Sequence, residues 1–175
     1  DLSRYIPSKT GYDFTGWYLD PECQEKAEDQ LTLNGDTTLY AGWQIQNRTL
    51  TFDTRGGCLI NPLTVTFGKT VDLKPFKPIK KGHTFTGWYM DPDCIREADR
   101  PFILNENTTL YAGWLIQERT LSFDANGGSE IDPVTVNYGT LIDLGDYVPV
   151  KEGCIFEDWY MDQEFTTKAD SSLIL

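Results

Sequence analysis

The sequence predicts an α+β protein made of tandem small modules, each a sheet of about four strands covered by one short helix. Trp17, Trp88 and Trp159 are evenly spaced (88 − 17 = 71; 159 − 88 = 71), and the segments around them repeat with the same period. Within one period, apolar and polar residues alternate as they do in half-buried strands. An Asp-Pro pair in the same period resembles the start of a helix.

The repeat predicts three units. The segment TTLYAGW occurs identically at residues 37–43 and 108–114, and TLTFDTRGG later returns as TLSFDANGG. The expected units are an incomplete one at 1–46, a complete one at 49–115 and an incomplete one at 120–175. The chain would then begin and end inside a repeat, like a fragment of a longer array. A second phase, starting each unit near Asp1, Asp72 and Asp143, stays open, because the connections QIQNR (44–48) and LIQER (115–119) fit either linkers or continuous strand.

The first two strands of a unit are expected to form a hairpin. Leu50 and Phe52 alternate with threonines, and Leu63, Val65 and Phe67 do the same after a Gly-Gly turn. Alternation with a period of two is typical of half-buried strands, and glycine pairs suit turns that need positive φ. The third unit keeps this pattern.

A third strand, a helix and a fourth strand complete the unit. The segment HTFTGWYMD predicts a strand with Phe85 and Tyr89 on one face and Trp88 on the other. Asp91 and the proline after it resemble a helix N-cap, so we expect a two-turn helix over residues 92–100. The segment TTLYAGW supplies the last strand.

The charge balance excludes some classes of partner. Fifteen basic and 27 acidic side chains give a formal charge of −12. Nucleic acids and anionic membrane surfaces both require an excess of Lys and Arg, so neither is expected as a partner. No run approaches the roughly 20 apolar residues of a membrane span, and no leader opens the chain, so we expect a soluble fragment.

The order and spacing of LTFDTRGG, VTFGKTVDL, GHTFTGWYMDPDC and TTLYAGW resemble the Listeria-Bacteroides repeat family, also known from the B repeat of internalin B. The resemblance covers essentially the whole chain. It implies β-grasp-like (ubiquitin-like) modules, each with a mixed or mainly antiparallel four-stranded sheet and one short helix. Such modules stand in tandem in secreted or cell-wall-anchored bacterial surface proteins. The third unit departs from the pattern at Glu157, Asp158 and Gln163, and the cysteines are another departure.

The cysteines do not form a recognisable motif. Cys23 and Cys94 share one repeat position, each four residues before an alanine that would lie on the same helix face. Phe165 stands there in the third unit, which favours a buried apolar role over a disulfide or ligand role. Cys58 and Cys154 are expected in loops or at strand edges. Free thiols and disulfides both stay open for them.

Catalytic and metal sites are not expected. The counterparts of His83, the single histidine, share no chemistry with it, and no hydrolase, phosphate-binding or zinc spacing appears. The acid-rich loops DPECQEKAED and LNGDTT lack calcium-loop spacing, so solvated carboxylates are favoured. Asp20, Asp91 and Asp162 are expected to cap helices. We therefore predict no enzyme, cofactor or metal.

The tryptophans allow two interpretations. Trp17 with Trp43, and Trp88 with Trp114, could stack on sugars or grip a protein partner. However, a domain of about 60 residues buries only about 60% of its unfolded surface and needs large aromatic residues in its core. Core packing is therefore favoured, and ligand-binding residues stay unknown.

These observations predict a non-enzymatic tandem-repeat region that acts as a stalk or spacer and as an adhesion or host-interaction module at the cell surface or cell wall. The alternative is a carbohydrate- or receptor-binding module that uses aromatic residues exposed in each unit. The expected partners are host or bacterial surface proteins, glycans and neighbouring repeats. Incomplete end units would leave sheet edges open, so strand-mediated self-association is also expected.

Overall fold

The structure, a computed structural model, describes residues 1–175. By its internal contacts it divides into two compact units, which are numbered here separately from the three sequence repeats. Unit 1 comprises Asp1–Pro78 and Gly87–Gly113, and unit 2 comprises Ile79–Thr86 and Trp114–Leu175. The strands are β1 (Tyr12–Tyr18), β2 (Tyr40–Ile45), β3 (Asn47–Asp53), β4 (Leu63–Thr66), β5 (Lys69–Val71), β6 (His83–Tyr89), β7 (Phe102–Leu104), β8 (Thr108–Ile116), β9 (Glu118–Leu121), β10 (Val134–Asn137), β11 (Leu141–Asp143) and β12 (Ser172–Ile174).

The fold is nearly all β, and the prediction of α+β, β-grasp-like modules is wrong. The only helical segments are two 3-10 turns, η1 (Leu2–Arg4) and η2 (Leu144–Asp146). No α-helix covers any sheet. The short helix expected after each Asp-Pro pair is replaced by a loop.

The loop after Asp91 shows why the helix does not form. Cys94 has a φ of 56°, and a left-handed residue cannot continue a right-handed helix. The carboxylate of Asp91 accepts the backbone N–H groups of Ile95 and Arg96 at 3.0 and 2.7 Å. Asp91 therefore closes a loop around the left-handed residue.

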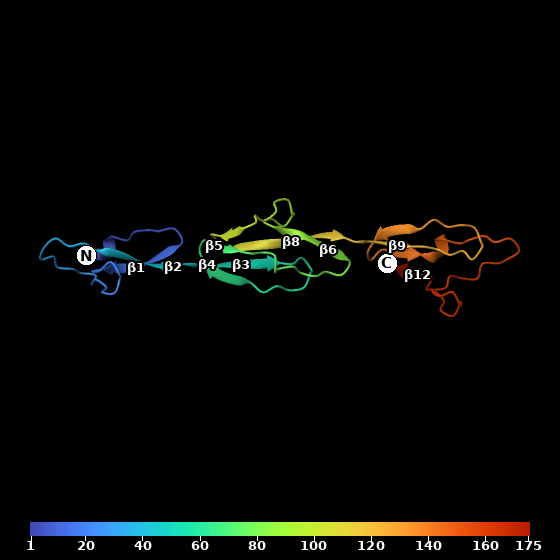
Figure 1. Ribbon diagram of the computed structural model, residues 1–175, viewed down its shortest axis with the longest axis horizontal. Coiled ribbons are helices and arrows are strands. Elements are labelled where there is room, and N and C mark those ends of the chain that lie inside the picture. The colour runs from blue at the N-terminus through green and yellow to red at the C-terminus, as the bar shows by residue number, and fades with distance from the viewer. The chain divides into compact units, whose positions relative to one another are not determined.

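The largest sheet has four strands in the order β4-β3-β8-β6 (Figure 1). β3 and β4 pair antiparallel, which confirms the predicted hairpin. β3 and β8 pair parallel, with Leu50 opposite Thr108 and Phe52 opposite Leu110. The largest fully buried side chains are Leu50 on β3, Leu110 on β8 and Leu104 on β7 (Phe102–Leu104), so the core of unit 1 draws on this sheet and on the separate β5–β7 pair.

β1 and β2 form a separate antiparallel pair in unit 1. Their register shifts between Phe14 and Gly16, and Gly16 has a φ of 135°. This bulge lets the rings of Phe14 and Trp17 meet at 5.5 Å. A bulge of this kind breaks the period of two that a regular strand keeps.

Two short strand pairs were not predicted. β5 pairs antiparallel with β7 in unit 1, and β11 pairs antiparallel with β12 in unit 2. All four strands have three residues, and such short segments carry too little alternation to stand out in a sequence.

Unit 2 contains the β9–β10 hairpin, which again confirms the predicted pairing. Its core is built on Ile142, Leu144 and Ala169, with half-buried side chains packed against them, among them Phe123 and Trp159. Residues 154–159 form no strand, although the equivalent residues of the two earlier repeats form β1 and β6.

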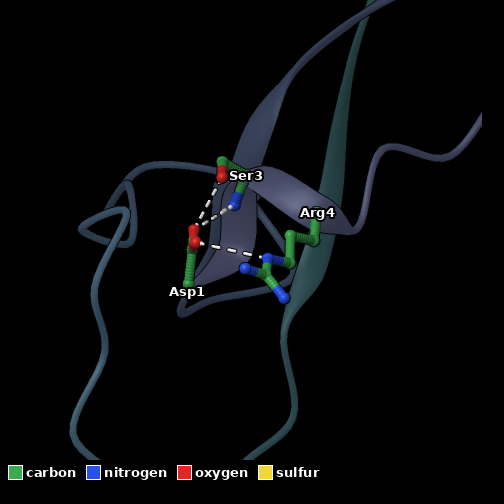
Figure 2. Close-up of polar contacts among 3 residues, drawn as sticks. All are labelled: Asp1, Ser3 and Arg4. Carbon is green, nitrogen blue, oxygen red and sulfur yellow. Dashed lines mark hydrogen bonds and ion pairs between the residues drawn. The ribbon is translucent and has the colours of Figure 1, made fainter.

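An aspartate caps a turn near the start of each 71-residue period. Figure 2 shows the first: Asp1 Oδ1 accepts the backbone N–H of Ser3 at 3.1 Å and its hydroxyl at 2.6 Å, while Arg4 Nε lies 3.7 Å from Oδ2. Asp72 and Asp143 likewise accept a backbone N–H two residues on, at 3.0 and 2.9 Å.

Candidate functional site: aromatic anchors and repeat junctions

One tryptophan in each repeat is a structural anchor. The indole N–H of Trp17, Trp88 and Trp159 donates to the carbonyl twelve residues earlier, at 2.8, 2.7 and 2.8 Å. The acceptors, Tyr5, Phe76 and Tyr147, each stand four residues after a capping aspartate. Each repeat thus ties its third strand segment to its capped turn. Trp88 is only 3% exposed, so it cannot be a ligand platform.

Trp43 and Trp114 are more accessible than Trp88. Both are half-buried, and each meets the edge of a phenylalanine ring with centroids 5.6 Å apart. The ammonium groups of Lys9 and Lys80 lie 5.8 Å from the centroids of Trp43 and Trp114, respectively. A lysine beside an aromatic face is a cation–π arrangement, and it covers part of the surface that a sugar would use.

The recurrent aspartates are loop organisers and not helix caps. Asp20 accepts N–H groups from Gln24 and Glu25, and Asp162 accepts them from Thr166 and Thr167. Hydrogen bonds to a carboxylate favour its charged form. The N–H of Glu25, followed by that of Gln24, accordingly lowers the pKa of Asp20.

The other two loops show the same effect. The N–H of Ile95, followed by that of Arg96, lowers the pKa of Asp91. Hydrogen bonding led by the N–H of Thr166 lowers the pKa of Asp162 to about 2. These carboxylates are held by the backbone around them.

The cysteines are unbridged. Cys23 and Cys94 are half-buried, and Cys58 and Cys154 are exposed. The predicted buried role for the first pair is wrong, because the shared position lies in the left-handed residue of the loop, where Phe165 is 56% exposed. The nearby alanines are buried, and each donates its backbone N–H to the carbonyl of the anchoring tryptophan; they are Ala27, Ala98 and Ala169.

His83 has a local structural environment. Its Nδ1 lies 2.9 Å from the carbonyl oxygen of Lys81, and its ring meets Trp114 edge-on with centroids 6.4 Å apart. No group of three or more His, Cys, Asp or Glu side chains converges in the structure. No helix has the length and apolar character of a membrane span.

The junctions between repeats are ordered, whereas the sequence alone left open whether the connecting residues are linkers or continuous strand. β2 ends at Ile45 and β3 begins at Asn47, so Gln46 alone connects the first two repeats; Gln117 alone separates β8 from β9. The first junction lies within unit 1 and the second within unit 2. The connecting segments therefore act as nearly continuous strand and not as free linkers.

Each connecting glutamine bridges two repeats through its backbone. The N–H of Gln46 donates to Gly11 at 2.9 Å, and its carbonyl accepts the N–H of Phe67 at 2.8 Å. At the second junction the N–H of Gln117 donates to the carbonyl of Gly82, and its own carbonyl accepts from Tyr138, at 2.8 and 2.7 Å. Because the same backbone hydrogen bonds recur at both junctions, the connection between repeats has a defined backbone geometry.

Side chains reinforce the first junction. Gln46 Nε2 donates to Asp13 Oδ1 at 2.5 Å, and the guanidinium of Arg48 donates to Gln46 Oε1. The same guanidinium lies 5.5 Å from the ring centroid of Phe67.

The second junction repeats this arrangement. Gln117 Nε2 donates to the hydroxyl of Thr84 at 3.2 Å, and Arg119 donates to Gln117 Oε1 at 2.8 Å. Arg119 lies 5.7 Å from the ring centroid of Tyr138. The signal in the sequence was a Gln-x-Arg motif at a spacing of 71 residues (117 − 46 = 71).

A glycine at each junction makes room for an aromatic ring. A Cβ at Gly11 would come within 2.2 Å of the ring of Phe67, and one at Gly82 within 1.9 Å of the ring of Tyr138. Both glycines also have positive φ, 77° and 69°. Glycine is required at both positions for close approach and for backbone conformation.

The model of the Listeria-Bacteroides repeat domain matches residues 2–42, 49–113 and 120–174. The chain belongs to the Listeria-Bacteroides repeat family. The family resemblance inferred from the sequence motifs is confirmed, and the bounds expected for the three units stay predictions.

Several proteins are similar to this chain in sequence. A putative membrane protein of Evansella cellulosilytica is 36% identical over 166 residues, which are 94% of this chain and 25% of the relative. A putative Gly-rich membrane protein of the same organism is 36% identical over 163 residues, 91% of this chain and 18% of the relative. Internalin H of Listeria monocytogenes is 41% identical over 86 residues, 47% of this chain and 15% of the relative. The chain spans a quarter or less of the length of these relatives. No solved structure matches it.

Proposed function

We propose that these Listeria-Bacteroides repeats form a non-enzymatic spacer in a bacterial surface protein, holding other parts of that protein away from the cell. The observation that carries this proposal is the single-residue junction, in which one glutamine connects consecutive repeats and an arginine of the following strand donates to its side chain. A spacer needs joints that resist bending, and flexible reach grows with linker length. One connecting residue, bonded on both sides, leaves little freedom at each joint.

Small-angle scattering tests the spacer proposal. We expect the profile of the chain to fit a fixed arrangement at each junction and to stay unchanged between low and high salt. The double variant Gln46→Gly/Gln117→Gly removes the side-chain contacts and adds backbone freedom, so its distance distribution should broaden. A wild-type profile that already requires freely moving repeats would overturn the proposal.

A second candidate function is ligand binding at the cell surface, for adhesion or host interaction. It is favoured by the recurrence of a half-buried tryptophan at the same place in two repeats, Trp43 and Trp114. Repeated weak sites would add by multivalency. A glycan array probed with the wild type and with Trp43→Ala/Trp114→Ala tests this role. Absence of any signal from the wild type would exclude the carbohydrate form.

A further inference from the structure

The chain enters the second repeat through one strand and leaves it through another. β3 begins at Asn47, directly after the junction residue Gln46, and β8 ends at Ile116, directly before Gln117. Tension between the neighbouring repeats follows the covalent chain, so it enters the second repeat at the start of β3 and leaves it at the end of β8. Whatever joins these two strands to each other must carry that tension before the residues between them can unravel.

β3 and β8 are neighbours and run parallel (Figure 1), with the register extending from Leu50 opposite Thr108 to Asp53 opposite Tyr111. Because the two strands point the same way, the start of β3 and the end of β8 lie at opposite ends of the pair. Tension on these two ends therefore slides one strand along the other. The hydrogen bonds of a parallel ladder are evenly spaced, so sliding loads them together, whereas pulling on both strands from one end would break them in turn.

The apolar core resists the same sliding motion. Leu50 on β3 and Leu110 on β8 are fully buried, and Phe52, opposite Leu110, is only 5% exposed. The ring of Phe52 lies 4.7 and 4.9 Å from those of Phe76 and Trp88. A shift of one residue would turn alternating side chains to the wrong face of the sheet. The strands can therefore slide only if this core opens and exposes apolar surface to water.

Side chains clamp the start of β3 to the residues just before β8. The backbone N–H of Thr49 donates to Asn107 Oδ1 at 2.8 Å, and Arg48 Nε donates to the carbonyl oxygen of Asn105 at 3.1 Å. The donors follow Gln46 within three residues (49 − 46 = 3), and the acceptors precede Thr108 within three (108 − 105 = 3). These two bonds extend the ladder to the point where tension enters the repeat.

We propose that the β3–β8 pair, with its clamp at Asn105 and Asn107, is a force-bearing element that keeps the second repeat folded while the array is under tension. The purpose of this element rests on the proposed spacer function, because a spacer is stretched whenever the parts that it connects are pulled apart. Stiffness of the joints and strength of the strand pair are nevertheless separate properties. The first concerns the junction glutamines, and the second concerns contacts inside one repeat.

Single-molecule force spectroscopy on the full chain tests the proposal through the direction of pulling. Handles on non-natural side chains at Asn47 and Leu115, both exposed, load the second repeat along the native path and leave the thiols untouched. Handles at Asn47 and the exposed Glu106 pull β3 and β8 from the same end. We expect a rupture force roughly twofold or more higher for the first pair of handles, because the evenly spaced bonds then share the load.

Two matched variants test the clamp. Asn107→Ala removes the acceptor of the Thr49 N–H, which lies on the tension path. Asp72→Ala removes the acceptor of the Lys74 N–H, a bond of 3.0 Å in the same repeat but outside the β3–β8 pair. Each variant deletes one hydrogen bond from a side chain to the backbone, so both should lower the melting temperature similarly. Only Asn107→Ala should lower the rupture force along the native path.

Equal rupture forces for the two pairs of handles would overturn the proposal, and so would equal forces along the native path for Asn107→Ala and Asp72→Ala. These outcomes are distinct from a failure of the spacer function. Scattering measures the joints without load, so freely moving repeats combined with a direction-dependent rupture force would reject the spacer and retain the force-bearing pair. Fixed joints combined with equal forces in both directions would do the reverse.

Discussion

At the scale of single residues, the structure relies on short polar side chains that hold the backbone. An aspartate caps the turn near the start of each period, and a second aspartate closes the loop after each anchoring tryptophan. Each of these carboxylates accepts N–H groups that a loop would otherwise leave without a partner. The aspartates therefore recur for structural reasons.

The loop carboxylates predict a dependence of stability on pH. The pKa of Asp162 is lowered to about 2 from 3.8. Its stabilising contribution is thus complete above the unfolded pKa and is lost as pH falls from 3.8 toward 2. We expect Asp162→Asn to lower the melting temperature above about pH 4, with the difference from wild type shrinking toward pH 2.

Circular dichroism melts at several pH values measure this difference. Asp170→Asn is the control, since Asp170 is an exposed carboxylate outside these loop contacts. A difference between Asp162→Asn and wild type that stays constant down to pH 2 would contradict the loop role.

The exposure of the four cysteine thiols predicts the order in which they react with an alkylating reagent. All four cysteines are unbridged, with Cys58 and Cys154 exposed and Cys23 and Cys94 half-buried. Cys94 Sγ also lies 3.2 Å from the guanidinium of Arg55. We expect an alkylating reagent followed by mass spectrometry to label the exposed pair first, because access limits the reaction. A disulfide found by non-reducing peptide mapping of the freshly purified protein would contradict this prediction.

At the scale of elements, sequence reasoning predicted strands well where alternation was long. The β3–β4 and β9–β10 hairpins follow from several alternating positions around a Gly-Gly turn. The helix prediction failed because Asp-Pro also begins a tight loop, and no local pattern showed that Cys94 would be left-handed. The three-residue strands were too short to detect. Gly11 and Phe67 are far apart in sequence, so their contact required the structure.

The junction glycines predict a difference between two alanine substitutions. Gly82 and Gly139 both have positive φ, 69° and 85°, so alanine costs about 1–2 kcal/mol at either position. Only at Gly82 would the new Cβ meet a ring, that of Tyr138 at 1.9 Å, whereas nothing lies within 4 Å at Gly139. Overpacking should add about 1–3 kcal/mol for Gly82→Ala.

Hydrogen exchange of the backbone amides of Gln117 and Tyr138 is the sharpest readout, because these amides form the junction bonds. Their protection should fall in Gly82→Ala and persist in Gly139→Ala. Equal loss in both variants would show that backbone strain, and not the ring contact, sets the junction's stability.

At the scale of the whole molecule, the acidic charge opposes contact between copies. The formal charge is −12, and two such molecules repel each other at low ionic strength. The screening length falls to about 10 Å at 0.1 M salt. We therefore expect net repulsion between copies at low salt that weakens as sodium chloride is raised, measured as the concentration dependence of the sedimentation coefficient. An attraction between copies that strengthens as salt is lowered would contradict this expectation.

The junction has a consequence for how such arrays change length. The glycine that receives the ring, the bridging glutamine with its arginine, and the aromatic residue that fills the contact all recur once per 71-residue period (82 − 11, 117 − 46 and 138 − 67). An in-frame duplication of one period copies every part of the joint together, wherever within the period the breakpoint falls. Recombination between similar gene segments can therefore lengthen or shorten the array one repeat at a time, and each new joint is functional without further mutation.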